Sequence, residues 1–92
     1  MPPPKTAPKH PTPQERLARL KFLQAKAMST MTTLRDTHRR LLNKLAMTQP
    51  GERHIIINEE IRDVGLQLIE MEDEIDMRKE KIAEIAAAER EA

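Results

Sequence analysis

A Pro-Gly pair, Pro50-Gly51, separates two long apolar repeats in this sequence. Pro-Gly is a strong signal for a turn. On each side of it, mostly apolar residues recur at alternating spacings of three and four, the pattern of a helix with one buried stripe. The positions before the turn are Leu17, Leu20, Gln24, Ala27, Met31, Leu34, His38, Leu41, Leu45 and Thr48. Those after it are Ile57, Ile61, Val64, Leu68, Met71, Ile75, Arg78, Ile82, Ile85 and Glu89. We name these positions the seam.

Folding the chain back at the turn pairs seam residues whose numbers sum to 102. Leu34 then faces Leu68, and the polar residues Gln24 and Arg78 fall in one layer. The pattern predicts an all-α fold, an antiparallel two-helix coiled-coil hairpin. Gln24, His38 and Arg78 are its polar seam residues, and we expect them to set the register, because polar groups in a seam lower stability but restrict pairing.

The expected bounds are an extended arm over residues 1–12, a first helix over about 13–48, a turn over about 49–53 and a second helix over about 54–90. Thr12-Pro13-Gln14-Glu15 has the form of a capping box with proline at the first helical position. Residues 29–33 are poor helix formers, so a break there stays open. The seam keeps its phase through them, which favours one continuous helix.

The arm contains most of the prolines, which fix φ and remove backbone donors. We therefore expect it to be extended, close to polyproline II. Two interpretations of this basic, Pro-rich segment stay open. It is either a solvated tail or an anchor that binds a partner.

Charge is divided unevenly along the chain. Residues 1–54 carry eleven Lys or Arg against three Asp or Glu, a net of +8, and residues 55–92 carry five against twelve, a net of −7. A basic helix beside an acidic one is the simplest interpretation, with Lys44 and Glu60 as one expected pair flanking the seam. Exposed pairs contribute only about 0.2–1 kcal/mol each, so they would orient the hairpin more than stabilise it.

Composition excludes several classes of protein. There is no cysteine, hence no disulfide framework and no thiolate metal site. No apolar run approaches the roughly 20 residues of a membrane span, and the N-terminus lacks the apolar core of a signal peptide. We expect an intracellular protein, or a component of a particle assembled inside cells.

Residues for catalysis are scattered. His10, His38 and His54 lie in the arm, the first helix and the turn, and none has metal-ligand spacing with a carboxylate. No nucleophile stands near a base, and no Gly-rich phosphate loop is present. The acidic run over residues 70–76 is typical of a solvated helix face. We predict no enzymatic activity, no cofactor, no metal and no small-molecule substrate.

A two-helix hairpin covers its seam only in part, and chains of this length seldom fold on such a core alone. We therefore expect a structural or adaptor subunit, completed by helices of a partner or of a second copy. The seam has two flanks. The apolar flank is charged at seven of its nineteen positions, which are Ala18, Lys21, Ala25, Met28, Thr32, Arg35, Arg39, Leu42, Ala46, Ile55, Asn58, Arg62, Gly65, Ile69, Glu72, Asp76, Lys79, Ala83 and Ala86. The charged flank is charged at eleven of its twenty positions, which are Arg16, Arg19, Leu23, Lys26, Thr30, Thr33, Thr37, Arg40, Lys44, Met47, Ile56, Glu60, Asp63, Gln67, Glu70, Glu74, Met77, Lys81, Glu84 and Ala88. The expected partner interface lies on the apolar flank and comprises Met28, Leu42, Ile55, Gly65, Ile69, Ala83 and Ala86.

The alternative is an accessory nucleic-acid-binding protein. Basic side chains of the arm and of the first helix could follow a phosphate backbone. Against it stand a net charge of +1, a single aromatic residue and the absence of any known DNA-binding motif. A membrane-surface role is not expected, because the apolar stripe is already used by the seam. The candidate phosphate contacts are Lys5, Lys9, Arg19, Lys26, Arg39 and Arg40.

Overall fold

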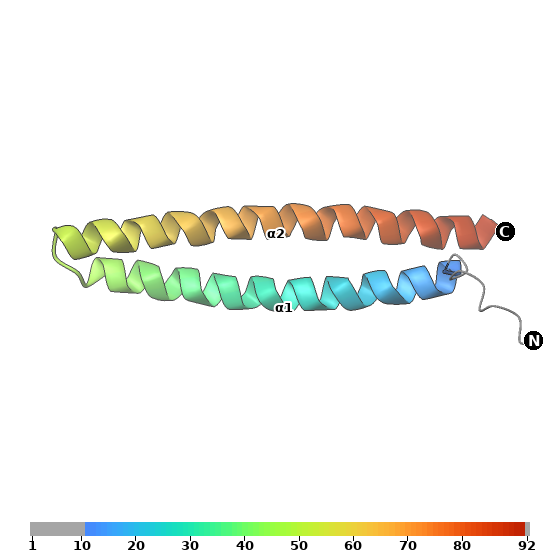
Figure 1. The fold of residues 1–92 in the computed structure, drawn as a ribbon, viewed down its shortest axis with the longest axis horizontal. Coiled ribbons are helices and arrows are strands. Elements are labelled where there is room, and N and C mark those ends of the chain that lie inside the picture. The colour runs from blue at the N-terminus through green and yellow to red at the C-terminus, as the bar shows by residue number, and fades with distance from the viewer. Residues whose placement is uncertain (1–10, 92) are drawn as a thin grey trace, which may run out of the picture.

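The fold is a pair of long helices lying side by side. The computed structural model describes residues 11–91, which form α1 (Pro13–Ala46) and α2 (Glu52–Glu91), joined by a loop over residues 47–51. The helices run in opposite directions, so the end of α2 lies beside the start of α1 (Figure 1). The predicted all-α hairpin is confirmed, and no strand occurs within the described range.

The start of α1 follows from its capping residues. The backbone N–H of Glu15 donates to Thr12 Oγ1 over 3.1 Å, and the N–H of Arg16 donates to the Thr12 carbonyl over 2.9 Å. Pro13 occupies the first helical position, where its missing N–H leaves no bond unmade. The predicted start of the helix is confirmed.

The threonine-rich stretch does not interrupt α1, so the expectation of one continuous helix is confirmed. The hydroxyls of Thr30, Thr32 and Thr33 each donate to the carbonyl four residues earlier, at 3.1–3.3 Å. Bonding back in this way satisfies each hydroxyl within the helix, which is the arrangement expected of threonine on a helix surface. The seam residues Ala27, Met31 and Leu34 stay in phase through this stretch, since all three are buried or half-buried.

The loop turns the chain within five residues. α1 ends when the N–H of Met47 donates to the carbonyls of Asn43 and Lys44, each at 3.2 Å. Gly51 has a φ of +157°, a value that side-chain-bearing residues rarely adopt, and its carbonyl accepts the N–H of Ile55. α1 ends at residue 46 and α2 begins at residue 52. The sequence predicted about 48 and about 54, so both boundaries lie two residues earlier than expected.

The core is the seam itself. All ten seam positions before the turn are buried or half-buried, and so are nine of the ten after it; Glu89, near the open end, is exposed. Only four residues in the described range are buried, namely Ala27, Met31, Ile57 and Ile85, and each keeps 5–8% of its surface exposed. The 3,4 pattern therefore identified the contact surface, but two helices leave most of that surface half-covered.

The pairing of layers gives a direct test of the register. Leu34→Cys with Leu68→Cys should link within one chain when treated with a short thiol crosslinker, because both residues sit in the layer that sums to 102. Leu34→Cys with Ile57→Cys is the matched control and should not link, because Ile57 lies about 16 Å from Leu68 along α2, toward the loop. The measurement is the mass of proteolytic peptides; a link found only between two chains would mean that the helices pair between molecules.

Candidate partner interface

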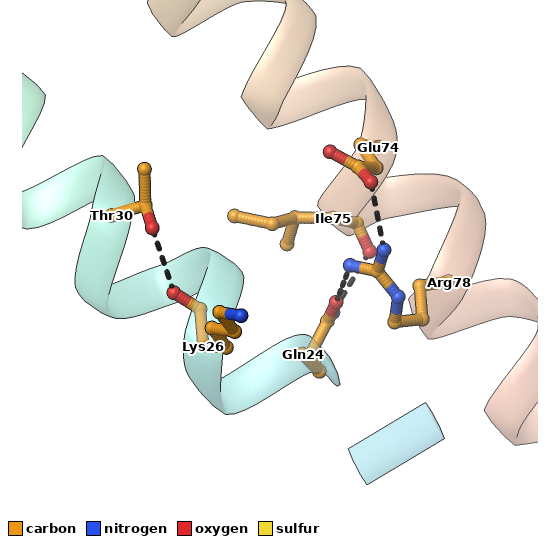
Figure 2. Close-up of polar contacts among 6 residues, drawn as sticks. All are labelled: Gln24, Lys26, Thr30, Glu74, Ile75 and Arg78. Carbon is orange, nitrogen blue, oxygen red and sulfur yellow. Dashed lines mark hydrogen bonds and ion pairs between the residues drawn. The ribbon is translucent and has the colours of Figure 1, made fainter. Parts of the chain in front are cut away.

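A polar cluster joins the helices toward the open end of the hairpin. Gln24 Nε2 donates to the Ile75 carbonyl over 2.8 Å, and Arg78 Nη1 donates to Gln24 Oε1 over 3.1 Å. Arg78 Nη2 also pairs with Glu74 Oε1 at 2.9 Å (Figure 2). The side chain of Arg78 is only 12% exposed, against 54% for Glu74. Gln24 and Arg78 thus share one layer, as the pairing predicts; their role in setting the register remains a prediction.

The histidines are not brought together. His38 is half-buried in the middle of α1, and His54 lies half-buried in the first turn of α2, with its Nδ1 3.4 Å from Asn58 Nδ2. His10 falls outside the described residues. Across residues 11–91, no group of three or more His, Cys, Asp or Glu side chains could hold a metal ion.

The expected ion pair between the helices is not formed. Within the described range, both ion pairs lie inside α2, Glu74 with Arg78 and Lys81 with Glu84. Lys44 and Glu60 border the same surface groove but make no ion pair. The prediction of this pair was wrong, and the reason is physical. Two exposed, flexible side chains gain too little Coulomb energy in water to offset the conformational entropy lost on pairing.

The predicted partner interface contains large, exposed apolar side chains. The exposed fractions are 57% for Met28, 45% for Leu42, 60% for Ile55 and 58% for Ile69. Ala83 is exposed, and Gly65 and Ala86 are half-buried. This flank is continuous across the two helices, because Met28 and Thr32 of α1 line one groove with Glu72 and Asp76 of α2.

Gly65 has no packing function within the hairpin. A Cβ placed on it would meet no atom within 4 Å, although a glycine inside a helix costs about 1 kcal/mol relative to alanine. The contact between α1 and α2 therefore does not require glycine at this position. The expected use of Gly65, close approach by another chain, stays a prediction.

Other large apolar side chains are exposed outside the predicted interface. Phe22 (68%) and Leu66 (54%) lie on the outer faces of the helices, away from the seam. Met47, Ile56 and Met77 are exposed on the charged flank. Sequence reasoning gave these five no role, and no signal could have found one, because single exposed apolar residues are common on protein surfaces.

The candidate phosphate contacts are only partly covered by the structure. Arg19, Lys26, Arg39 and Arg40 are all exposed, and none belongs to an ion pair within residues 11–91. They do not form a purely basic surface, because Lys26 borders a groove shared with Glu74. Lys5 and Lys9 lie outside the described residues.

Comparisons of this chain with protein-family models, with curated proteins and with solved structures find no match. Neither of the two described helices is long and apolar enough to cross a membrane.

The polar cluster predicts a non-additive pair of substitutions. Gln24→Leu should lower the free energy of unfolding by about 1 kcal/mol, because the guanidinium of Arg78 loses a partner in a part-buried layer. Arg78→Met should cost a similar amount. The double variant should be at least as stable as the wild type, because an apolar layer needs no hydrogen bonds. Urea unfolding followed by circular dichroism, at one protein concentration throughout, gives the comparison. Additive losses would show that the two side chains are not coupled.

Proposed function

We propose that this chain is a non-enzymatic structural or adaptor subunit of a larger protein assembly, and that it acts through helix packing. The observation that carries the proposal is the incomplete core: only four buried residues in the described range, beside an apolar flank whose large side chains are 45–60% exposed. A chain that acted alone would gain little from such a surface. A subunit gains from it when a neighbour covers it.

The energetics support completion by further helices. Each helix has one apolar stripe, and a single neighbour covers that stripe only in part. Ordering close to eighty residues costs about 1.5 kcal/mol of conformational entropy per residue. The free energy gained by burying four side chains and half-covering the seam exceeds this cost by little at most. Adding helices on the apolar flank gives a coiled-coil or four-helix arrangement, in which the seam and that flank become one core.

The Pro-rich arm provides a second attachment in this proposal. Residues 1–12 combine prolines with Lys5 and Lys9, so the arm could lie in an extended conformation along a partner surface. Prolines reduce the freedom that an extended segment loses on binding. The first ten residues of the arm lie outside the described range.

The test compares two double variants that add the same charge to opposite flanks. Leu42→Glu with Ile69→Glu should abolish assembly, because the contact would bury unpaired carboxylates. Thr30→Glu with Thr37→Glu on the charged flank should be tolerated. Each tagged variant is expressed in its natural source, and the mass of the isolated complex is measured by native mass spectrometry and sedimentation.

Circular dichroism on the purified variants checks that both hairpins still fold. A wild-type chain that is isolated at the mass of one chain would contradict the proposal. If the first double variant still assembles while the second dissociates, the partner docks on the charged flank instead.

The second candidate function is binding to nucleic acid, which one observation favours: Arg19, Lys26, Arg39 and Arg40 are exposed and form no ion pair within residues 11–91. If they contact phosphates, the affinity should fall steeply with salt, and Arg19→Gln with Lys26→Gln and Arg40→Gln should reduce the salt slope by about 3. Salt titrations with duplex and single-stranded nucleic acid measure both quantities. Absence of binding at low salt would exclude this function.

A further inference from the structure

The apolar flank has a feature that points to one occupant. Resting on the function proposed above, we propose that this flank is covered by a second copy of the chain, packed antiparallel, with a two-fold axis at the level of Ile69. Each α2 then lies against the α2 of the other copy, and each α1 against the other α1. The turns of the two hairpins point in opposite directions.

The charges on α2 support this axis. Arg62 lies seven residues before Ile69 and Asp76 lies seven residues after it, and both are exposed on the apolar flank. A two-fold axis at Ile69 inverts the order of residues along the helix. Arg62 of each copy therefore comes to lie opposite Asp76 of the other, and the pair is formed twice, as an isologous interface requires.

The charges of α1 on this flank are all basic, and the same axis brings one like pair of them together. In the layers that sum to 102, Arg39 lies at the level of Asp63 and Arg35 at the level of Gln67. The axis at Ile69 carries the level of residue 63 to that of residue 75, and the level of residue 67 to that of residue 71. Because each α1 faces the other α1, Arg35 lies about 6 Å along the helix from Arg35 of the other copy. Asp76 and Glu72 of the other copy are nearly level with Arg39 and Arg35, on the neighbouring α2.

The parallel alternative brings like charges together. With both turns at one end, each α1 would face the α2 of the other copy at equal levels. Arg39 would then oppose Arg62, and Lys21 would oppose Lys79, and each like pair would form twice. Like charges placed opposite one another select against an arrangement. The antiparallel arrangement instead places Lys79 near Asn58.

Side-chain size also fits the antiparallel dimer. Ile55 lies fourteen residues before Ile69 and Ala83 lies fourteen after it, so a large residue meets a small one at each end of the contact. Ile69 meets its own symmetry mate at the centre, and Leu42 falls near Ala25 of the other α1. Large residues facing small ones allow two helix surfaces to interlock.

The available area is sufficient. From the level of Ile55 to that of Ala86, the flank is about 45 Å long at 1.5 Å per residue. Two helices packed about 10 Å apart make it about 20 Å wide. Each copy would thus contribute about 900 Å², and a total of about 1,800 Å² lies in the range of stable, specific interfaces.

The first experiment places one cysteine in a chain that has none. Ile69→Cys should form a disulfide-linked dimer at dilute concentration, because the two copies meet at this residue. Leu66→Cys is the matched control: Leu66 is 54% exposed, close to the 58% of Ile69, but it lies on the outer face of the same helix. It should stay monomeric on a non-reducing gel. Equal crosslinking of both variants would overturn the proposed contact.

The second experiment exchanges charges. Arg62→Glu should weaken dimerisation by about tenfold or more in sedimentation equilibrium, because each dimer then opposes two pairs of carboxylates. Adding Asp76→Arg to this variant should restore the affinity, since the pair is re-formed with opposite polarity. The two positions are about 21 Å apart in one helix, so rescue must come from the other copy. Arg16→Glu, at an exposed position of the charged flank, is the control and should dimerise as the wild type does.

The two proposals fail in different ways. A purified wild-type chain that sediments as a monomer, or a charge exchange that gives no rescue, overturns the antiparallel dimer. If Leu42→Glu with Ile69→Glu still abolishes the native assembly in that case, the subunit function stands, and a different protein covers the flank. If neither the dimer nor the native assembly responds to these substitutions, both proposals fail.

Discussion

The structure depends on one constraint: each helix has a single apolar stripe, and the chain provides only one other helix to cover it. The two stripes face each other along nearly the whole length of the hairpin. Burial along this seam is the main stabilising contribution, at about 25 cal/mol per Å² of apolar area removed from water. Because two cylinders touch along a line, the seam side chains remain accessible from both flanks, and only four of the described residues are buried.

Two features are expected to restrict the register, one toward each end of the hairpin. At one end, the short loop with Gly51 joins the helices and limits how far they can slide. Toward the open end, Gln24 and Arg78 interrupt the apolar layers and bond to each other, and Gln24 also bonds to the backbone of Ile75. An apolar layer would be satisfied in several registers, whereas these directional bonds are lost when the helices shift.

Electrostatics contribute differently from what the charge distribution suggested. The net +8 and −7 of the two parts of the chain favour placing the helices side by side, but within the described residues no ion pair crosses between them. The charged side chains that border the seam keep their freedom in water. On the apolar flank this leaves Arg35, Arg39 and Arg62 on one side of Ile69, and Glu72, Asp76, Lys79 and Lys21 on the other. That order is compatible with an antiparallel copy and opposes a parallel one.

The sequence by itself determined the hairpin. Its signals are local: the 3,4 spacing, the capping residues from Thr12 to Glu15, and the Pro50-Gly51 turn. Such signals define where a helix begins, which of its faces is buried, and where the chain reverses direction. Tertiary structure alone decided how those helices use their surfaces. It showed that Lys44 and Glu60 do not pair, that Arg78 binds both Gln24 and Glu74, and that a Cβ at Gly65 would meet no other part of the hairpin. Side-chain pairing is a competition between partners and water within a few ångströms, and a pattern along one chain does not contain those distances.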